Sequence, residues 1–411
     1  MEGYLVKEKH ILPDSLNAYE YIVEFTNTYK KFKTAPIAVR EAHCLDVMWK
    51  HWPCPMEEGD LLAGRLLIGE IGFSSEPLFG RSGGFFYDGK QLDLMLESNE
   101  YDSVEKDNIR VVKEYWIREE SRRNLRAGYP EYMKYALPED IYWEHPGVAF
   151  PLYRMVGAYL DYEKLLRLGL GGLSEEIAAK RDRVEREGGD ESLFSGMIMA
   201  LDQLSCLCRR YSLSAQKLAV QCGDPTDRVQ RLYIAGVLDN IALKPPETFI
   251  EAMQLVWLYS LVANTLNYGR MDDYLGDYLV WDLEQGILTE KEALEYTSSL
   301  WRLIAAKKTV FHGRVIIGGL GRHDEKNADR FALMAIEASR ITADIEPQLS
   351  MRFYGDQNPE LMERALDCIG EGRTYPILYN DDVNIPAVMD AFSVSREEAV
   401  NYMMFGCGEY V

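Results

Sequence analysis

The chain has 411 residues, of which 47% are hydrophobic and 27% charged, and this composition excludes a disordered or fibrous protein. Its 66 acidic residues against 45 basic ones give a formal charge of −21, which argues against nucleic acid or an anionic membrane surface as a partner. The longest apolar run, near Leu255 to Val262, is too short to span a bilayer, and the first residues lack a signal-peptide pattern, so a cytoplasmic location is expected.

The first half of the chain predicts mostly helices. A helical pattern of apolar residues covers residues 38–50, and dense charges with helical spacing cover residues 102–126. A long apolar run at residues 193–220 predicts a buried helix. The pattern at residues 226–243 predicts a further helix that stops before Pro245, because proline disfavours helical geometry in the residue before it.

The last third of the chain alternates helical and strand-like segments. Thr289 and Glu292 form a capping-box pattern that opens a helix running toward residue 308, and Ser395 with Glu398 opens a short helix later on. The segments between them run in the order strand 309–317, helix 327–340, strand 348–354, helix 359–369 and strand 376–379. Such alternation implies parallel strands joined by helical crossovers. The predicted fold class is therefore α/β, with a helix-rich body.

Several common site motifs are absent from the sequence. Gly169-Leu-Gly-Gly172 and Gly319-Leu-Gly321 do not complete a dinucleotide-binding fingerprint, and there is neither a phosphate-binding Gly-x-x-x-x-Gly-Lys motif nor a Gly-x-Ser-x-Gly elbow. These glycines are predicted to form turns instead. Cys206 and Cys208 are separated by one residue, fewer than zinc-binding pairs use, so no metal site is expected.

One stretch near the end of the chain, Gly406-Cys407-Gly408-Glu409, could carry chemistry. A cysteine between two glycines lies on backbone that can form a tight, protruding loop, and a carboxyl group two residues later could donate or accept a proton. The residues alone leave a second interpretation open. In that interpretation Cys407 is a small buried side chain at a helix end and Glu409 is solvated.

The stretch resembles the Gly-Cys-x-Glu thiyl loop of the glycyl radical enzymes, the pyruvate formate-lyase-like family. The resemblance extends from about residue 36 to residue 411, in the family's order. Besides the loop it rests on Pro245-Pro-Glu-Thr-Phe-Ile-Glu-Ala-Met-Gln254, Gly269-Arg-Met-Asp-Asp-Tyr274, Ile316-Ile-Gly-Gly319, Pro347-Gln-Leu-Ser-Met-Arg352, Pro376-Ile-Leu-Tyr-Asn-Asp381 and Ile385-Pro386. The combined match favours a catalytic Cys407 over a buried structural one.

The resemblance implies a fold and a set of roles. Residues 1–411 would form one pyruvate formate-lyase-like domain, the first half of a ten-stranded α/β barrel built from two five-stranded half-barrels. Cys407 would give its hydrogen to a glycyl radical, and its thiyl would abstract hydrogen from the substrate. Glu409 would act as general acid or base, and Gly406 and Gly408 would form the loop. The enzyme would be anaerobic and oxygen-sensitive.

The resemblance also implies partners but no directly bound cofactor or metal. A radical-SAM activating enzyme would install the glycyl radical, and the protein would be a homodimer. The family's glycyl loop is not found between Met1 and Val411. We therefore expect the chain to be the N-terminal half of the enzyme, either truncated or one subunit of a split enzyme whose glycyl-bearing C-terminal part is separate. Alone it would be inactive, with open strand edges.

Departures from the family pattern narrow the expected substrate. Cys407 stands between glycines, whereas members that cleave pyruvate carry two adjacent cysteines, so formate C-acetyltransferase-like acyl transfer is an alternative that we do not expect. Val148 replaces a substrate-binding histidine of the diol dehydratases, and Asn264 with Thr265 replaces their His-Ser pair. His145 could substitute for the missing histidine. The predicted activity is elimination, dehydration or decarboxylation of a small polar substrate, and the alternative from another class is an inactive remnant that serves as a binding or assembly module.

Overall fold

The computed structural model describes residues 18–51, 54, 56, 59–65, 71–74, 84–119, 127–136, 159–263, 265, 267–307, 313–405 and 408–410. The chain divides into two compact units, which are considered separately below. The first comprises Met1–Pro55, Leu66–Met155 and Gly171–Arg210, and the second comprises Met56–Arg65, Val156–Leu170 and Tyr211–Val411. None of the described helices is both long enough and apolar enough to cross a bilayer.

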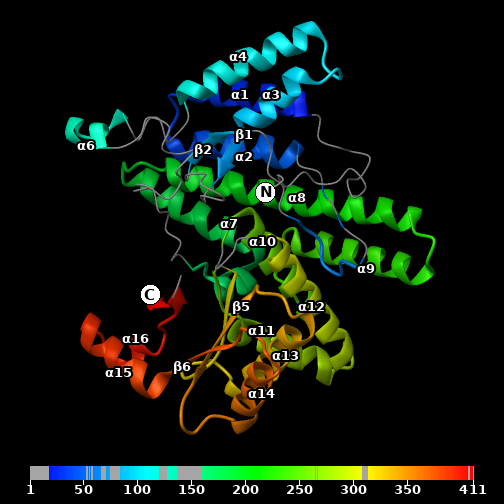
Figure 1. Cartoon of the computed structure of the whole chain (residues 1–411), viewed down its shortest axis with the longest axis vertical. Coiled ribbons are helices and arrows are strands. Elements are labelled where there is room, and N and C mark those ends of the chain that lie inside the picture. Colours follow the sequence, from blue (N-terminus) through cyan, green and yellow to red (C-terminus); the bar gives the residue numbers. More distant parts are fainter. Residues whose placement is uncertain are drawn as a thin grey trace. The chain divides into compact units, whose positions relative to one another are not determined.

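The first unit is built mainly from helices (Figure 1), and buried aromatic side chains form much of its core. Its elements are α1 (Ala18–Lys31), α2 (Ile37–His51), the hairpin β1 (Ile71–Ser74) with β2 (Gly84–Tyr87), α3 (Gly89–Glu97), α4 (Ser103–Glu119) and α6 (Glu131–Ala136). Phe25 and Trp116 are fully buried, and the Trp116 indole donates a 2.8 Å hydrogen bond to the hydroxyl of Thr26. These contacts join α1 to α4, because the buried indole N–H needs an acceptor.

The helices predicted in the first half of the sequence are present, with one error about burial. The pattern at 38–50 corresponds to α2 and the pattern at 102–126 to α4 over Ser103–Glu119, while residues 120–126 lie outside the described residues. The run at 193–220 forms α8 (Ser192–Gln221), but Leu213 and Val220 are 57% and 81% exposed. The prediction of a buried helix was therefore wrong for part of its surface. Helical periodicity identifies the helix, whereas the neighbouring elements decide which of its faces is covered.

The second unit contains a four-stranded parallel sheet with the strand order β3-β4-β5-β6. The strands are β3 (Asn267–Arg270), β4 (Arg314–Gly318), β5 (Gln348–Phe353) and β6 (Ile377–Asn380). The helices of this unit are α9 (Pro225–Ile241), α10 (Phe249–Val262), α11 (Met271–Glu284), α12 (Glu290–Ala306), α13 (Glu325–Thr342), α14 (Pro359–Gly370), α15 (Asp381–Phe392) and α16 (Arg396–Ala399), with α7 (Tyr162–Arg186) starting in it. Each strand returns to the next through helices, which confirms the predicted α/β class with helical crossovers. The five-stranded half-barrel stays a prediction.

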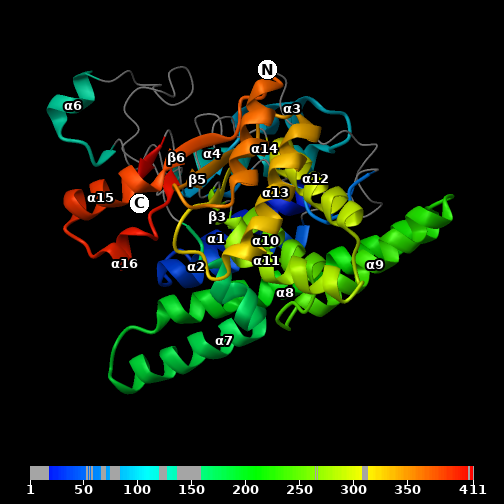
Figure 2. The same ribbon diagram turned by 90° about the horizontal axis from the view of Figure 1, so that it is seen from below.

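Strands β3, β4 and β5 are buried on both faces by different parts of the chain, whereas the edge strand β6 is partly exposed. Val315 and Ile317 are fully buried and alternate along β4 with Ile316, which faces the other side. Ile316 packs in a cluster with residues of α15 and of the segment after α16, including Ile385 and Met404. In both views of the fold, α15 and α16 lie on the side of the sheet away from α12 and α13 (Figures 1 and 2). The end of the chain therefore covers the sheet face that the crossover helices leave open.

The capping box at the start of α12 gives a local stability prediction. The Thr289 hydroxyl accepts a 3.2 Å bond from the Glu292 amide, and the Glu292 carboxylate accepts a 2.9 Å bond from the Thr289 amide. Thr289→Ala removes the acceptor for an otherwise unpaired amide, so we expect the free energy of unfolding to fall by about 1 kcal/mol in denaturant titrations. Lys291→Ala, on the same exposed turn, is the control and should change it by less than about 0.5 kcal/mol. Equal losses in both variants would contradict a specific capping role.

Candidate active site

Charged side chains gather where the four parallel strands end. Arg270 is the last residue of β3, Arg322 follows β4 after a turn, Arg352 lies near the end of β5, and Asp381 follows β6 directly. All four are at least nine-tenths buried. The carboxyl ends of parallel strands meet at one edge of a sheet, and in α/β proteins this edge is the usual place for a ligand or catalytic group. It is therefore the candidate active-site edge of the second unit.

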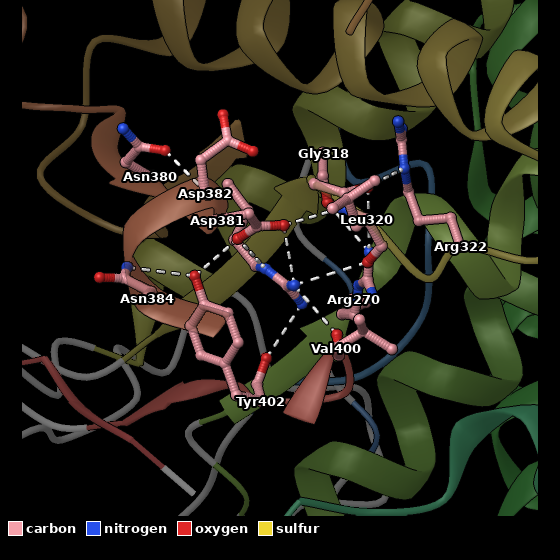
Figure 3. Close-up of polar contacts among 12 residues, drawn as sticks. Arg270, Gly318, Leu320, Arg322, Asn380, Asp381, Asp382, Asn384, Val400 and Tyr402 are labelled. Atoms are coloured by element: carbon pink, nitrogen blue, oxygen red, sulfur yellow. Dashed lines mark hydrogen bonds and ion pairs between the residues drawn. The ribbon is translucent and has the colours of Figure 1, made fainter. Parts of the chain in front are cut away.

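Arg352 and Asp381 form a fully buried ion pair at this edge. The Arg352 Nε and Nη2 atoms donate to the two carboxylate oxygens of Asp381, each at 2.9 Å. Asp381 also accepts a 2.7 Å bond from the Tyr402 hydroxyl and a 2.8 Å bond from the Leu320 amide, as Figure 3 shows. Burial, the largest influence, and the adjacent carboxylate both raise the pKa of Tyr402, so this phenol stays protonated. The two-pronged contact offsets the large cost of taking both charges out of water.

The remaining Arg352 donors bind the chain that leads into the predicted Cys407 loop. Nη1 donates to the Tyr402 carbonyl and Nη2 to the Val400 carbonyl, both at 3.0 Å. The guanidinium carbon also lies 4.1 Å from the centre of the Tyr402 ring, within the range of a cation–π contact. One side chain thus joins β5, the start of α15 and the segment that follows α16.

A short hairpin follows that segment. β7 (Met404–Phe405) pairs antiparallel with β8 (Glu409–Tyr410), and the Tyr159 hydroxyl donates to the Met404 carbonyl. The amide of Gly408 donates a 2.9 Å bond to the Phe405 carbonyl. Gly408 has a φ of 124°, which favours glycine, and a Cβ atom there would lie 3.2 Å from the Tyr379 hydroxyl. The described backbone on either side of the predicted loop, up to Phe405 and from Gly408, is therefore paired as an antiparallel hairpin.

A second buried cluster lies beside the first. Arg322 donates to Asp329 at 2.6 Å and to Asp272 at 3.3 Å, and Asp272 accepts a 2.7 Å bond from the Gly318 amide. Arg270 donates to the Gly318 carbonyl at 3.1 Å. Burial, with the positive charge of Arg352 as the next cause, lowers the pKa of Arg270 to about 10, so it remains a cation at neutral pH. The turn after β4 is thus held by charged groups on both sides.

The glycines of that turn behave as the sequence predicted. Gly318, Gly319 and Gly321 have φ values of 72°, 79° and 81°, in the left-handed region that glycine tolerates. Gly169, also predicted as a turn, instead lies inside α7 at a kink with a φ of 63°. At Gly319 no Cβ would fit, because it would lie 2.5 Å from the Cβ of Arg352.

Most of the residues predicted to act on substrate cannot be located. Gly406, Cys407, Asn264, Val148, His145 and the side chain of Glu409 lie outside the described residues. Thr265 is described, and it is buried in the turn between α10 and β3. Its hydroxyl donates to the Asn267 carbonyl at 3.4 Å, and its carbonyl accepts a 2.8 Å bond from Lys307. Its role in substrate binding stays a prediction, as do the roles of the other residues named here.

Sequence reasoning did not identify Arg352, Asp381 and Tyr402 as site residues. Arg352 and Asp381 stood only inside segments quoted for the family resemblance. A usable signal was nonetheless present, because Arg352 occurs in a run predicted as a buried strand, and a charged residue is almost never fully buried without a partner. Among the described residues, no group of three histidine, cysteine or acidic side chains is arranged to hold a metal ion.

Comparisons with known proteins place these observations in context. A family model described as "Pyruvate formate lyase-like" matches residues 4–411. The (2S)-3-sulfopropanediol dehydratase of Klebsiella oxytoca is 27% identical over 285 residues, which cover 63% of this chain and 34% of that protein. Isethionate sulfite-lyase of Desulfovibrio desulfuricans is 23% identical, over 95% of this chain and 50% of that protein.

Solved structures show the same fold over the same extent. The glycerol-bound form of the B12-independent glycerol dehydratase from Clostridium butyricum aligns with a TM-score of 0.73 at 21% identity, covering 95% of this chain and 52% of that one. The chain thus spans about half the length of the relatives that it matches along nearly its whole extent. By their names, the curated relatives include dehydratases, sulfite-lyases and a decarboxylase.

Proposed function

Because the chain belongs to the pyruvate formate lyase-like family of glycyl radical enzymes, we propose that it is the thiyl-bearing, substrate-binding part of a glycyl radical lyase. The proposed reaction is elimination, dehydration or decarboxylation of a small polar substrate. The relatives named above are lyases that break a carbon–oxygen, carbon–sulfur or carbon–carbon bond, and this range supports the reaction class without fixing the substrate.

One structural observation carries the proposal. Gly408 and the backbone of Glu409, the last two residues of the Gly-Cys-Gly-Glu motif, belong to the β7–β8 hairpin, and the lead-in to that hairpin is tied by Arg352 to the carboxyl end of the parallel sheet. Backbone on both sides of Cys407 is thus held at the sheet edge where α/β proteins place their catalytic groups.

The proposed roles follow the chemistry of the two side chains. We expect a glycyl radical on a further segment of the complete enzyme, installed by a radical-SAM activating enzyme. This radical supplies an acceptor for a hydrogen atom. Cys407 donates its thiol hydrogen, and its sulfur then takes a hydrogen atom from a substrate carbon. Glu409 transfers a proton to or from the substrate as the leaving group departs. The product radical recovers its hydrogen atom from the Cys407 thiol, and the sulfur then takes back the hydrogen atom that it gave up at the start, so atoms and electrons balance over the cycle.

Four residues singled out by the family resemblance are proposed to hold the substrate, in a site that excludes water. His145, Val148, Asn264 and Thr265 are the candidates for contacts with the substrate. Exclusion of water matters because a sulfur or carbon radical reacts with whatever donor reaches it. Tyr159, a partly buried phenol whose pKa burial raises, stays protonated and continues to donate to the Met404 carbonyl beside the loop. A homodimer, as in the family resemblance, is the proposed assembly.

The test is anaerobic reconstitution of the complete enzyme. The open reading frame that contains this chain is expressed together with an activating enzyme. Any adjacent frame that matches the part of the relatives not covered by this chain is expressed with them. Activated protein is then offered small diols, hydroxy acids, hydroxysulfonates and arylacetates. We expect release of water, sulfite or carbon dioxide from one class. Exchange of formate with pyruvate would instead indicate acyl transfer, and a glycyl radical signal without consumption of any candidate would favour the inactive binding module.

A further inference from the structure

We propose that Arg352 is a positioning residue, which holds the backbone leading into Cys407 at the carboxyl end of β5. The inference deepens the proposed function and rests on it for its catalytic meaning, although the contacts themselves do not depend on that function. Nothing in the family resemblance or in the names of the relatives assigns a role to this side chain. An ordinary buried ion pair uses its donors on the partner carboxylate, whereas Arg352 also donates to backbone carbonyls of a distant segment.

The guanidinium divides its donors between a fixed point and a loop. Two of its N–H groups bind Asp381, which is the first residue of α15 and also accepts the Leu320 amide. Its other hydrogen bonds go to the carbonyls of Val400 and Tyr402 at 3.0 Å, with a longer one of 3.5 Å to the Leu320 carbonyl. Arg352 therefore connects the carboxyl end of the sheet to the segment just before the hairpin through a single planar group.

The two carbonyls lie where a helix ends. α16 closes at Ala399 with Val400 as its C-cap, and the last carbonyls of a helix have no partner inside the helix. A cation at this end also interacts favourably with the partial negative charge of the helix terminus. Arg352 supplies both the hydrogen bonds and the charge. The direction in which the chain leaves α16 toward Met404 is thus set by the guanidinium plane.

Lysine at this position would keep the charge and lose the connection. An ammonium group is a point donor on a flexible stem, whereas the guanidinium has several donors fixed in one plane. Lysine can pair with Asp381, or it can reach a carbonyl, but it cannot reproduce all five hydrogen bonds of Arg352. Arg352→Lys therefore separates the positioning role from simple charge compensation.

Arg322 offers a matched control. Its side chain is also almost fully buried at the same strand ends, donates to the Gly319 carbonyl at 3.0 Å and pairs with Asp329 at 2.6 Å. None of the described contacts of Arg322 reaches the segment from Val400 to Tyr410. Arg322→Lys therefore makes the same chemical change at a similar depth without touching the hairpin.

The experiment measures backbone amide exchange with deuterium in the 411-residue chain, which needs no enzymatic activity. We expect the amides of β7 and β8 to exchange at least about tenfold faster in Arg352→Lys than in Arg322→Lys, after normalising both to global stability from denaturant titration. The overturning result is an increase that is equal in the two variants, or one that only follows their global stability. Such a result would make Arg352 an ordinary core ion pair.

A milder variant covers the case in which Arg352→Lys does not fold. Tyr402→Phe keeps the ring beside the guanidinium and removes the hydroxyl, which donates to Asp381 and accepts a 3.2 Å bond from the Asn384 side-chain amide. We expect hairpin amides to exchange about three- to tenfold faster in this variant, because one buried hydrogen bond that steadies the pair is lost. Exchange at the wild-type rate would overturn the proposal.

A second measurement links the positioning role to the cysteine. In a background that carries Cys206→Ser and Cys222→Ser, which removes an exposed and a half-buried thiol, labelling of Cys407 by a maleimide should also rise about tenfold in Arg352→Lys relative to Arg322→Lys. In the reconstituted enzyme, Arg352→Lys should lower kcat more than it changes KM. Faster hairpin exchange in an enzyme that turns over nothing would leave the positioning role standing and overturn the proposed function.

Discussion

Cys407→Ala is expected to lower kcat of the reconstituted enzyme by at least about 10³-fold, a loss of about 4 kcal/mol in transition-state stabilisation. The reason is that the proposed reaction passes every hydrogen atom through one sulfur. Cys368 cannot replace it, because this thiol donates to the carbonyl of Tyr375 at the amino end of β6, opposite the candidate site edge. Burial also raises the pKa of the Cys208 thiol to about 12.

The matched control is Cys206→Ala, because Cys206 is exposed on α8 and should retain wild-type turnover. Glu409→Gln separates the two steps of the proposed reaction. This variant should still exchange a substrate hydrogen with deuterium through Cys407, while elimination falls by about 10²- to 10⁴-fold. Full turnover in Cys407→Ala, measured as product formed under anaerobic conditions, would disprove the radical mechanism.

The fold class was predictable because its signals are local. The capping boxes at Thr289 and Ser395 form within one helical turn, and the structure shows both with the expected reciprocal hydrogen bonds. The strands predicted at 348–354 and 376–379 correspond to β5 and β6 within one residue at each end. Short-range hydrogen bonding and apolar periodicity decide these features, so a single sequence contains enough information to predict them.

The charged network at the strand ends was not predictable in the same way. Arg352 and Asp381 are separated by 29 residues in the sequence, and they meet because β5 and β6 pair in a register that aligns Phe353 with Asn380. Tyr402 joins them only because the chain returns over the open face of the sheet after α16. Register and return path depend on tertiary packing. The motif that contains Cys407 could be read from the sequence, whereas the side chains that hold its hairpin could not.

The same network makes Gly319→Ala the most damaging small substitution that we predict in the second unit. Gly319 has a φ of 79°, and a Cβ atom there would lie 2.5 Å from the Cβ of Arg352 and 2.6 Å from Oδ2 of Asp381. Both neighbours are fully buried and held by several hydrogen bonds, so neither can move without breaking the ion pair. We expect the free energy of unfolding to fall by about 3–5 kcal/mol in denaturant titration.

Gly286→Ala distinguishes the two contributions to that loss. Gly286 has a φ of 67°, close to that of Gly319, but a Cβ atom there would meet nothing within 4 Å. Its replacement should cost only the left-handed backbone penalty of about 1–2 kcal/mol. The excess in Gly319→Ala then measures the disturbance of the ion pair, and the same variant should accelerate amide exchange in β7 and β8 if Arg352 sets the position of the hairpin. Equal losses in the two variants would mean that backbone strain alone makes glycine necessary at position 319.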